Sequence, residues 1–251
     1  MKMIPVDLTH SNYGDVRKVK YDLAILPWGA TEPHNLHLSY TTDCLLSQAV
    51  AVNAAKLAFE QGVHAMVLPP ISLGAQNPGQ RDEPFCIHAR YETQKMILTD
   101  IVASLYHQGM RKMVVVNGHG GNSFKPMVRD LAVDYPDFLI VLVDWFAVVP
   151  QKDYFENKDD HAGELETSAM LYYYPEITDL SKAGAGEGRP FKIKGLTDGT
   201  GWTPRIWNKA TSDTGIGNPA LATAEKGERY VHEVVNRIAA LLVDLTTNTL
   251  Y

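Results

Sequence analysis

The stretch KMVVVNGHGGN, residues 112–122, joins a nearly continuous apolar run to a glycine-rich turn that carries a histidine. A run of this kind is typical of a strand in a parallel sheet whose two faces are both covered. Open α/β sheets place their binding sites at the carboxyl ends of such strands. Three further apolar runs have the same character, at residues 22–29, 64–74 and 138–145.

Helical segments are expected between and after these runs, at residues 43–61, 91–109, 122–134, 163–174 and about 219–247. The alternation of strands and helices predicts the α/β class. We expect a three-layer α/β/α sandwich with a mostly parallel sheet, formed by a single domain over residues 1–251.

The composition restricts the class of protein. The hydrophobic fraction of 45% and the charged fraction of 21% are those of an ordinary soluble domain. With 23 basic and 29 acidic residues, a net charge of −6 and no basic cluster, we expect no nucleic-acid or membrane partner. There is no transmembrane-length apolar run and no signal-peptide core. Cys44 and Cys86 form no metal-type pair, which predicts a cytoplasmic protein with structural thiols.

Potential metal ligands follow the first and third apolar runs. Glu32 and His34 come directly after the first run, and Pro33 favours an extended backbone that points both side chains the same way. Asp43 falls at the start of the next helix, and His119 lies between glycines that permit a tight turn. This oxygen and nitrogen set suits Zn²⁺, Mn²⁺ or Fe²⁺. We therefore expect one or two divalent ions, which Asp43 could bridge.

The stretch DDHAGELETS, residues 159–168, adds His161 and two glutamates just before a helix. Glu164 and Glu166 differ by about 200° around a helix, so both cannot face one site. One glutamate is a candidate ligand, and the other is expected to face solvent or to act as a charge at the helix N-terminus.

Each candidate taken alone has a simpler structural explanation. Asp43 could be only a helix N-cap, and Glu32 could be a solvated surface charge. We expect His37 and His88 to be structural. The metal-site hypothesis depends on three separate segments that deliver ligand-type residues to the same edge of the sheet.

The glycine-rich segment at residues 183–217 shows no clear period, which predicts long functional loops or a lid. We expect the loops from 145 to 217 to set specificity. Three tryptophans are candidate pocket walls, with burial in the core or at an interface as the alternative: Trp145, Trp202 and Trp207.

The segments GATEPHNLHL…TTD, VVVNGHGGN and HAGELETS, in this order, resemble the three signatures of the creatininase family of amidohydrolases. The segment GNPALATAEKG, residues 217–227, resembles a late motif of that family. The resemblance extends over about residues 20 to 230. It implies the three-layer fold, a homo-oligomer that is often a hexamer, and a metal-activated water. The reaction it implies is hydrolysis of a C–N bond, of the cyclic amide or formamide type, in a small-molecule substrate.

The resemblance also implies roles for individual residues. Zn²⁺ is the first expectation, and Mn²⁺ and Fe²⁺ are alternatives. His161 would be the acid/base or substrate-contacting residue. Glu164 is a second candidate catalytic residue. The implied metal ligands are Glu32, His34, Asp43 as the bridge, His119 and Glu166.

This chain departs from the family pattern after the histidine of its NGH motif. Gly120 and Gly121 stand where creatininases tend to carry a tyrosine and a metal-binding glutamate, which argues against creatinine as the substrate. Relatives with the NGHGGN form include formamidopyrimidine deformylases, a peptidase that trims a modified peptide precursor, and hydrolases of keto-inositols. The sequence does not choose among them.

Three other classes of protein have characteristic motifs that this sequence lacks. The sequence has no G-x-G-x-x-G after a strand, no G-x-S-x-G and no H-E-x-x-H. These absences argue against a nucleotide-binding module, a nucleophile-elbow serine hydrolase and a helical zinc protease. A non-catalytic metal-binding relative remains an alternative.

Overall fold

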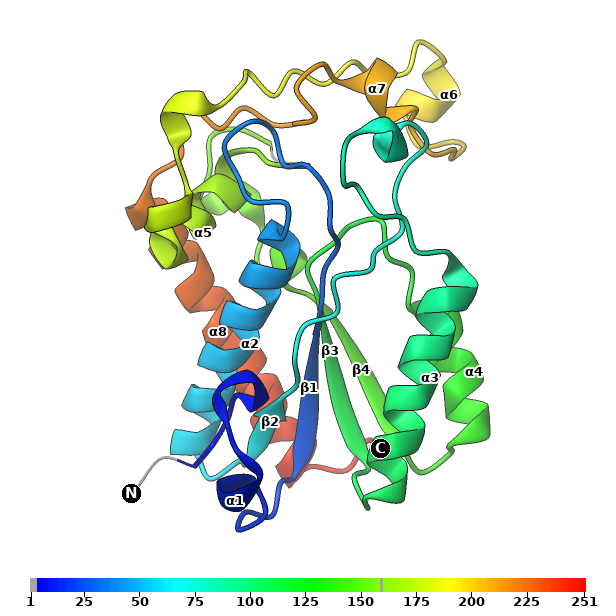
Figure 1. The fold of residues 1–251 in the computed structure, drawn as a ribbon, viewed down its shortest axis with the longest axis vertical. Helices are drawn as coiled ribbons and strands as arrows, with labels where there is room; N and C mark the ends of the chain where they lie inside the picture. The colour runs from blue at the N-terminus through cyan, green and yellow to red at the C-terminus, as the bar shows by residue number, and fades with distance from the viewer. Residues whose placement is uncertain (1–3, 159) are drawn as a thin grey trace.

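The computed structural model describes residues 4–158 and 160–251, which form three layers (Figure 1). The middle layer of this described chain is a four-stranded sheet with the order β2-β1-β3-β4, and all neighbouring strands are parallel. The strands are Leu23–Trp28 (β1), Ala65–Val67 (β2), Lys112–Asn117 (β3) and Leu139–Asp144 (β4). The predicted α/β class with a parallel sheet is confirmed.

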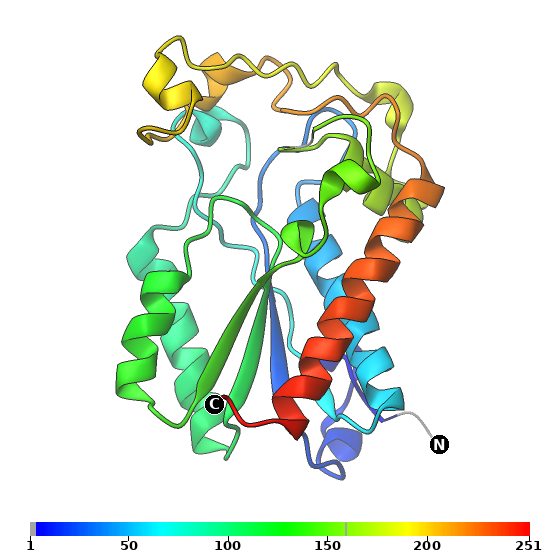
Figure 2. The ribbon, with the colours of Figure 1, turned by 180° about the vertical axis from the view of Figure 1, so that it is seen from behind.

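Helices cover both faces of the sheet, as the two opposite views show (Figure 1 and Figure 2). One face carries α2 (Thr42–Glu60), α5 (Glu164–Tyr173) and α8 (Ala224–Thr247). The other face carries α3 (Tyr91–His107) and α4 (Lys125–Asp134). All five predicted helices occur, and the largest difference in bounds is the start of α8, at Ala224 instead of residue 219.

The remaining helices are short. The four-residue helices are α1 (Tyr13–Val16), α6 (Lys194–Thr197) and α7 (Trp207–Ala210). Turns of 3₁₀ helix lie at Leu8–His10, Gln80–Asp82, Trp145–Ala147, Gln151–Asp153, Pro175–Ile177 and Leu180–Lys182.

The side chains of β1 point alternately to the two faces of the sheet, which explains why its apolar run is continuous. Leu23 and Ile25 pack into the core shared with α2 and α8. Ala24 and Leu26 pack into the second core, which is shared with α3 and α4. Because successive side chains of a strand point to opposite faces, a strand that is covered on both sides has no position for a solvated residue.

The second strand is much shorter than its apolar run. The run was predicted over residues 64–74, whereas the ladder covers only Ala65–Val67. Pro69 and Pro70 follow shortly, and proline has no backbone N–H to donate to a ladder. Beyond the prolines the chain still runs beside β1, since Gly29 N donates to Ile71 O at 2.9 Å.

The segment 183–217 lies above the carboxyl ends of the strands and carries α6 and α7 (Figure 1). It connects α5 to α8 across the top of the sheet instead of extending the core. In the part of the chain described here, no helix combines the length and the apolar character that a membrane span requires.

Helix α8 approaches α5 at Gly227, where a Cβ would lie 2.0 Å from Ser168 O. We predict that Gly227→Ala lowers the free energy of unfolding by about 1–3 kcal/mol, because the two helix backbones must separate. Gly195→Ala on α6 is the matched control, since a Cβ there would meet only an ordinary contact at 3.8 Å. Urea unfolding of both variants measures the difference, and equal stability would contradict this packing.

Candidate metal centre

Six side chains named from the sequence meet above the carboxyl ends of β1 and β3. Glu32 and His34 lie in the loop after β1, Asp43 lies in the first turn of α2, and His119 follows β3. Their ligand atoms lie within 4.8 Å of one another in three groups: Glu32, His34 and His161; Glu32, Asp43 and His119; His34, Asp43 and Glu166. The structure therefore brings together all the expected ligands and His161.

Two glycines allow the N-terminus of α2 to reach the ends of the strands. A Cβ at Gly29 would lie 2.5 Å from the backbone nitrogen of Cys44, and a Cβ at Gly118 would lie 2.4 Å from Asp43 O. Such distances are shorter than atoms tolerate, so only glycine permits the approach. This close approach places Asp43 beside the residues that follow β1 and β3.

Each histidine of the cluster holds one ring nitrogen against a backbone carbonyl. A neutral imidazole that donates to a carbonyl keeps its lone pair on the other nitrogen, so the carbonyl fixes the tautomer. The three contacts are His34 Nδ1 to Glu32 O at 3.0 Å, His119 Nε2 to Ala75 O at 2.8 Å and His161 Nε2 to Pro33 O at 2.9 Å.

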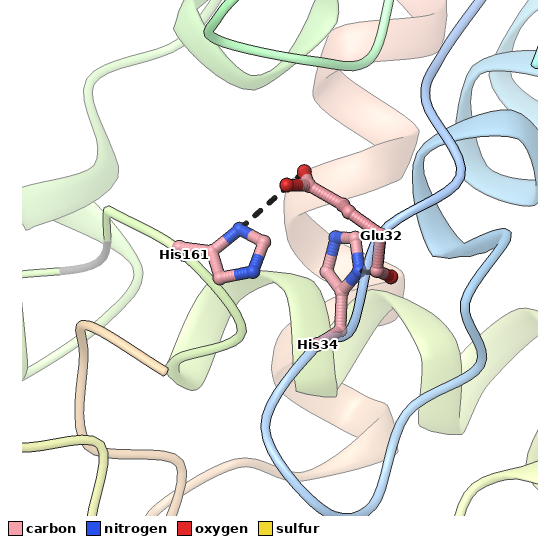
Figure 3. A group of neighbouring side chains, drawn as sticks. All are labelled: Glu32, His34 and His161. Carbon is pink, nitrogen blue, oxygen red and sulfur yellow. Dashed lines mark hydrogen bonds and ion pairs between the residues drawn. The ribbon is translucent and has the colours of Figure 1, made fainter. Parts of the chain in front are cut away.

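The second ring nitrogen of each histidine faces the carboxylates. His34 Nε2 lies 3.0 Å from Asp43 Oδ1, and His119 Nδ1 lies 2.8 Å from Glu32 Oε1 and 3.2 Å from Asp43 Oδ2. His161 Nδ1 lies farther from Glu32 Oε1, at 3.8 Å (Figure 3). At these distances a protonated ring donates its second N–H to the carboxylate, whereas a neutral ring sets two lone pairs against each other, which a cation would have to separate.

Two buried carboxylate oxygens of the cluster also require a positively charged partner. Glu32 and Asp43 are 0% and 2% exposed. Among residues 4–158 and 160–251, Glu32 Oε1 and Asp43 Oδ2 have no hydrogen-bond donor while the His119 ring is neutral, because the group that faces both of them is His119 Nδ1. Leaving a buried anionic oxygen without a partner is costly. The nitrogen and oxygen donors around these two atoms fit a divalent ion such as Zn²⁺ or Mn²⁺.

The same charges control the protonation of the histidines. Burial lowers the pKa of His34, but the Asp43 carboxylate outweighs burial and raises this pKa to about 10. Burial also lowers the pKa of His119, but the charges and hydrogen bonds of Glu32 and Asp43 together outweigh burial, so this pKa lies well above its ordinary value. His161 is the exception: burial and then the charge of His34 lower its pKa, so its ring is neutral near pH 7.

A cavity of about 180 Å³ opens onto the cluster. Besides ligand candidates, its lining includes Phe146, Gln151 and Asp160. Gly120 also lines it, and a Cβ on Gly120 would meet nothing within 4 Å. Gly121 is different, because its Cβ would lie 2.1 Å from Ala75 O. The turn therefore requires glycine at position 121, whereas Gly120 leaves space for the contents of the cavity.

The two glutamates of α5 have separate surroundings. Glu166 lines the cavity, and its Oε2 accepts from Ala162 N at 2.6 Å. Glu164 is outside the three groups of the cluster; it accepts from Asn157 N at 2.8 Å and pairs with Lys226 Nζ at 2.6 Å. Of the two alternatives expected for the second glutamate, exposure to solvent was wrong, because Glu164 is fully buried against this lysine. The other alternative, a charge at the helix N-terminus, agrees with its place in the first turn of α5.

The three tryptophans also differ. Trp145 is fully buried and packs on Tyr230, whereas Trp202 is 86% exposed. Trp207 meets the cluster, since its ring lies edge-on to His161 with centroids 5.3 Å apart. Of the three candidate pocket walls, Trp207 is thus the one in contact with a residue of the site.

Sequence reasoning missed two residues that shape the site. Asn117 ends β3, accepts from His119 N at 3.1 Å and donates to His119 O at 2.9 Å, so it fixes the turn that presents the histidine. Its position before the Gly-His pair was an available signal. Gln80 contacts Glu32 from a loop without periodicity or motif, so the sequence offered no signal for it.

Comparison with known proteins gives the family. The creatininase profile, described as creatinine amidohydrolase, matches residues 7–242. A Bacteroides fragilis protein, whose crystal structure is provisionally described as a creatinine amidohydrolase, is 56% identical, with a TM-score of 0.98 and 99% of each chain covered.

Two curated relatives have other substrates in their names. A mycofactocin precursor peptide peptidase of Mycobacterium tuberculosis is 30% identical over 86% of this chain and 84% of its own length. A 3-dehydro-scyllo-inosose hydrolase of Thermotoga maritima is 25% identical over 89% of this chain and 78% of its own length. The profile match over nearly the whole chain shows that this protein belongs to the creatininase family and is an enzyme of the amidohydrolase type.

Proposed function

We propose that this enzyme hydrolyses a C–N bond of a small molecule, of the cyclic amide or formamide type, with a water activated by one or two divalent ions. One observation carries the proposal: three histidines fixed by backbone carbonyls turn their other nitrogens toward two buried carboxylates. That arrangement holds ligand atoms ready before a metal arrives.

The ligands we propose are Glu32, His34, Asp43, His119 and Glu166. Asp43 is the proposed bridge, because its Oδ1 faces His34 while its Oδ2 faces His119. Two groups of ligand atoms therefore meet at this one carboxylate. The nitrogen and oxygen set favours Zn²⁺ first, with Mn²⁺ or Fe²⁺ as alternatives.

Bound there, a divalent ion supplies Lewis-acid polarisation of a carbonyl and a water of lowered pKa. The chain supplies the proton transfer. The lowered pKa of His161 leaves its ring neutral near pH 7, and the contact of Nε2 with Pro33 O turns Nδ1 toward Glu32 and the cavity. His161 is thus oriented to accept a proton and to return it to a leaving nitrogen.

The cavity supports a small substrate. Its volume of about 180 Å³ is below the roughly 300–1,000 Å³ of pockets that enclose drug-sized ligands. A hydrolase of a keto-inositol on the same metal site is the second candidate, because a 3-dehydro-scyllo-inosose hydrolase is 25% identical over 89% of this chain. We retain a homo-oligomer, a hexamer by family resemblance, and a cytoplasmic location as proposals.

Metal content tests the centre directly. We predict that the purified protein holds one or two transition-metal ions per chain and that Asp43→Asn loses most of them, because the bridge loses its charge. Asp130→Asn is the matched control, since Asp130 forms a surface ion pair with Lys95. Elemental analysis by mass spectrometry gives the counts. A wild-type protein without transition metal after reconstitution would exclude the proposal.

The role of His161 has its own test. We predict that His161→Gln keeps the metal content but lowers kcat by about 10²- to 10⁴-fold, the usual contribution of a general acid or base. The substrate is whichever member of a panel of cyclic amides, formamides and keto-inositols the wild type hydrolyses. Loss of metal from this variant would instead make His161 a ligand, which its place beside Glu32 and His34 permits.

Proton release tests the protonation of the cluster. Because the pKa values of His34 and His119 are raised, both rings are doubly protonated cations at pH 7 before metal binds. Ligand nitrogens must be deprotonated, so zinc binding should release about two protons. The release should disappear in alkaline buffer, where these rings are already neutral. Calorimetric titration in buffers of different ionisation enthalpy measures it, and zero release at pH 7 would contradict the assignment.

A further inference from the structure

The loop of residues 75–82 lies against the candidate metal ligands although it contributes none of them. Its most deeply buried member is Gln80, which is 1% exposed and stands at the start of the Gln80–Asp82 turn. A glutamine side chain that is buried in this way must satisfy both ends of its amide, so its partners reveal its orientation.

Both ends of the Gln80 amide are engaged. Its Oε1 accepts from Asn77 N at 2.6 Å, which fixes the oxygen on that side because a backbone N–H can only donate. Its Nε2 must therefore point the other way, where it donates to Glu32 Oε2 at 2.5 Å. A hydrogen bond to a buried carboxylate is charge-assisted and stronger than a neutral one.

Because of this hydrogen bond, the two carboxylate oxygens of Glu32 have different partners. Oε2 is held by Gln80, while Oε1 faces His119 Nδ1 at 2.8 Å and His161 Nδ1 at 3.8 Å. We propose that Gln80 is a positioning residue of the metal centre: it holds Oε2 and so presents Oε1 as the single ligand oxygen of Glu32. This inference rests on the metal site of the proposed function.

The loop that carries Gln80 is itself anchored on both sides of the site. Ala75 O receives the His119 ring at 2.8 Å, so one loop orients both His119 and Glu32. On the other side, Pro78 O accepts from Trp207 N at 2.7 Å. Asn208 Nδ2 donates to Asp82 Oδ2 at 2.9 Å, which ties the same loop to α7.

Through these contacts, residues 75–82 form a single loop that orients metal ligands without binding the ion. Trp207, which is bonded to the loop, also places its ring against His161. Partners that orient metal ligands in this way typically contribute about 10- to 100-fold in metal affinity. Gln80 should contribute in that range although it never contacts the ion.

The experiment compares Gln80→Met with Gln94→Met. Methionine has nearly the shape of glutamine but cannot donate to Glu32 Oε2. Gln94 on α3 is a matched control, because it is also 1% exposed but donates to Ala89 O, outside the cluster. Zinc affinity is measured by competition with a chelator, and the visible absorption of the Co²⁺-loaded protein reports the coordination of the ion.

We expect Gln80→Met to bind zinc about 10- to 100-fold more weakly than Gln94→Met and to show an altered Co²⁺ spectrum. A merely structural role would lower thermal stability without changing that spectrum. If Gln80→Met does not fold, Gln80→Glu keeps the shape, sets a second carboxylate against Glu32 and should alter the same spectrum.

The outcomes separate the two proposals. Wild-type protein that binds neither zinc nor cobalt would remove the metal site and this inference with it. Wild-type protein that binds both ions, with Gln80 variants that match Gln94→Met in affinity and spectrum, would overturn the inference and leave the metal site intact.

Discussion

Two buried carboxylates, Glu32 and Asp43, are the constraint on which the rest of the site depends. They lie at the top of the sheet, and one oxygen of each receives no hydrogen bond from the described chain while the His119 ring that faces both is neutral. Negative charge in such a place must be balanced by a cation. Two histidines take this role when they are protonated, and a divalent ion would take it when it binds, so metal binding and proton binding compete for the same atoms.

The fold serves this constraint by keeping the ligands rigid. The carboxyl ends of parallel strands converge on one edge, and two glycines allow α2 to bring Asp43 to that edge. Backbone carbonyls of Glu32, Pro33 and Ala75 then orient the three imidazole rings. The orientation of the three rings is therefore set by the main chain.

The family of this chain is known. Its substrate depends on the shape and lining of the cavity. Relatives named as a peptide peptidase and an inosose hydrolase are 30% and 25% identical to this chain. Gly120 leaves open space beside the cluster, and Asp160 and Gln151 line the same cavity. Asp160 pairs with Arg205, a residue of the segment that crosses above the strands. We therefore expect substrate specificity to be set by the loops around the cavity and not by the metal ligands.

The sequence by itself determined the layers, the parallel sheet and the gathering of Glu32, His34, Asp43, His119, His161 and Glu166, because periodicity and strand ends are local properties of the chain. It did not determine the length of β2, where prolines stopped the ladder, or the burial of Glu164, which depends on Lys226 from a helix sixty-two positions away. Gln80 was also invisible, since its role exists only in its hydrogen bond to Glu32 across forty-eight positions. Only the tertiary structure decides such contacts, because a polar side chain in a loop acquires its partner from the packing of distant segments and not from its neighbours in the sequence.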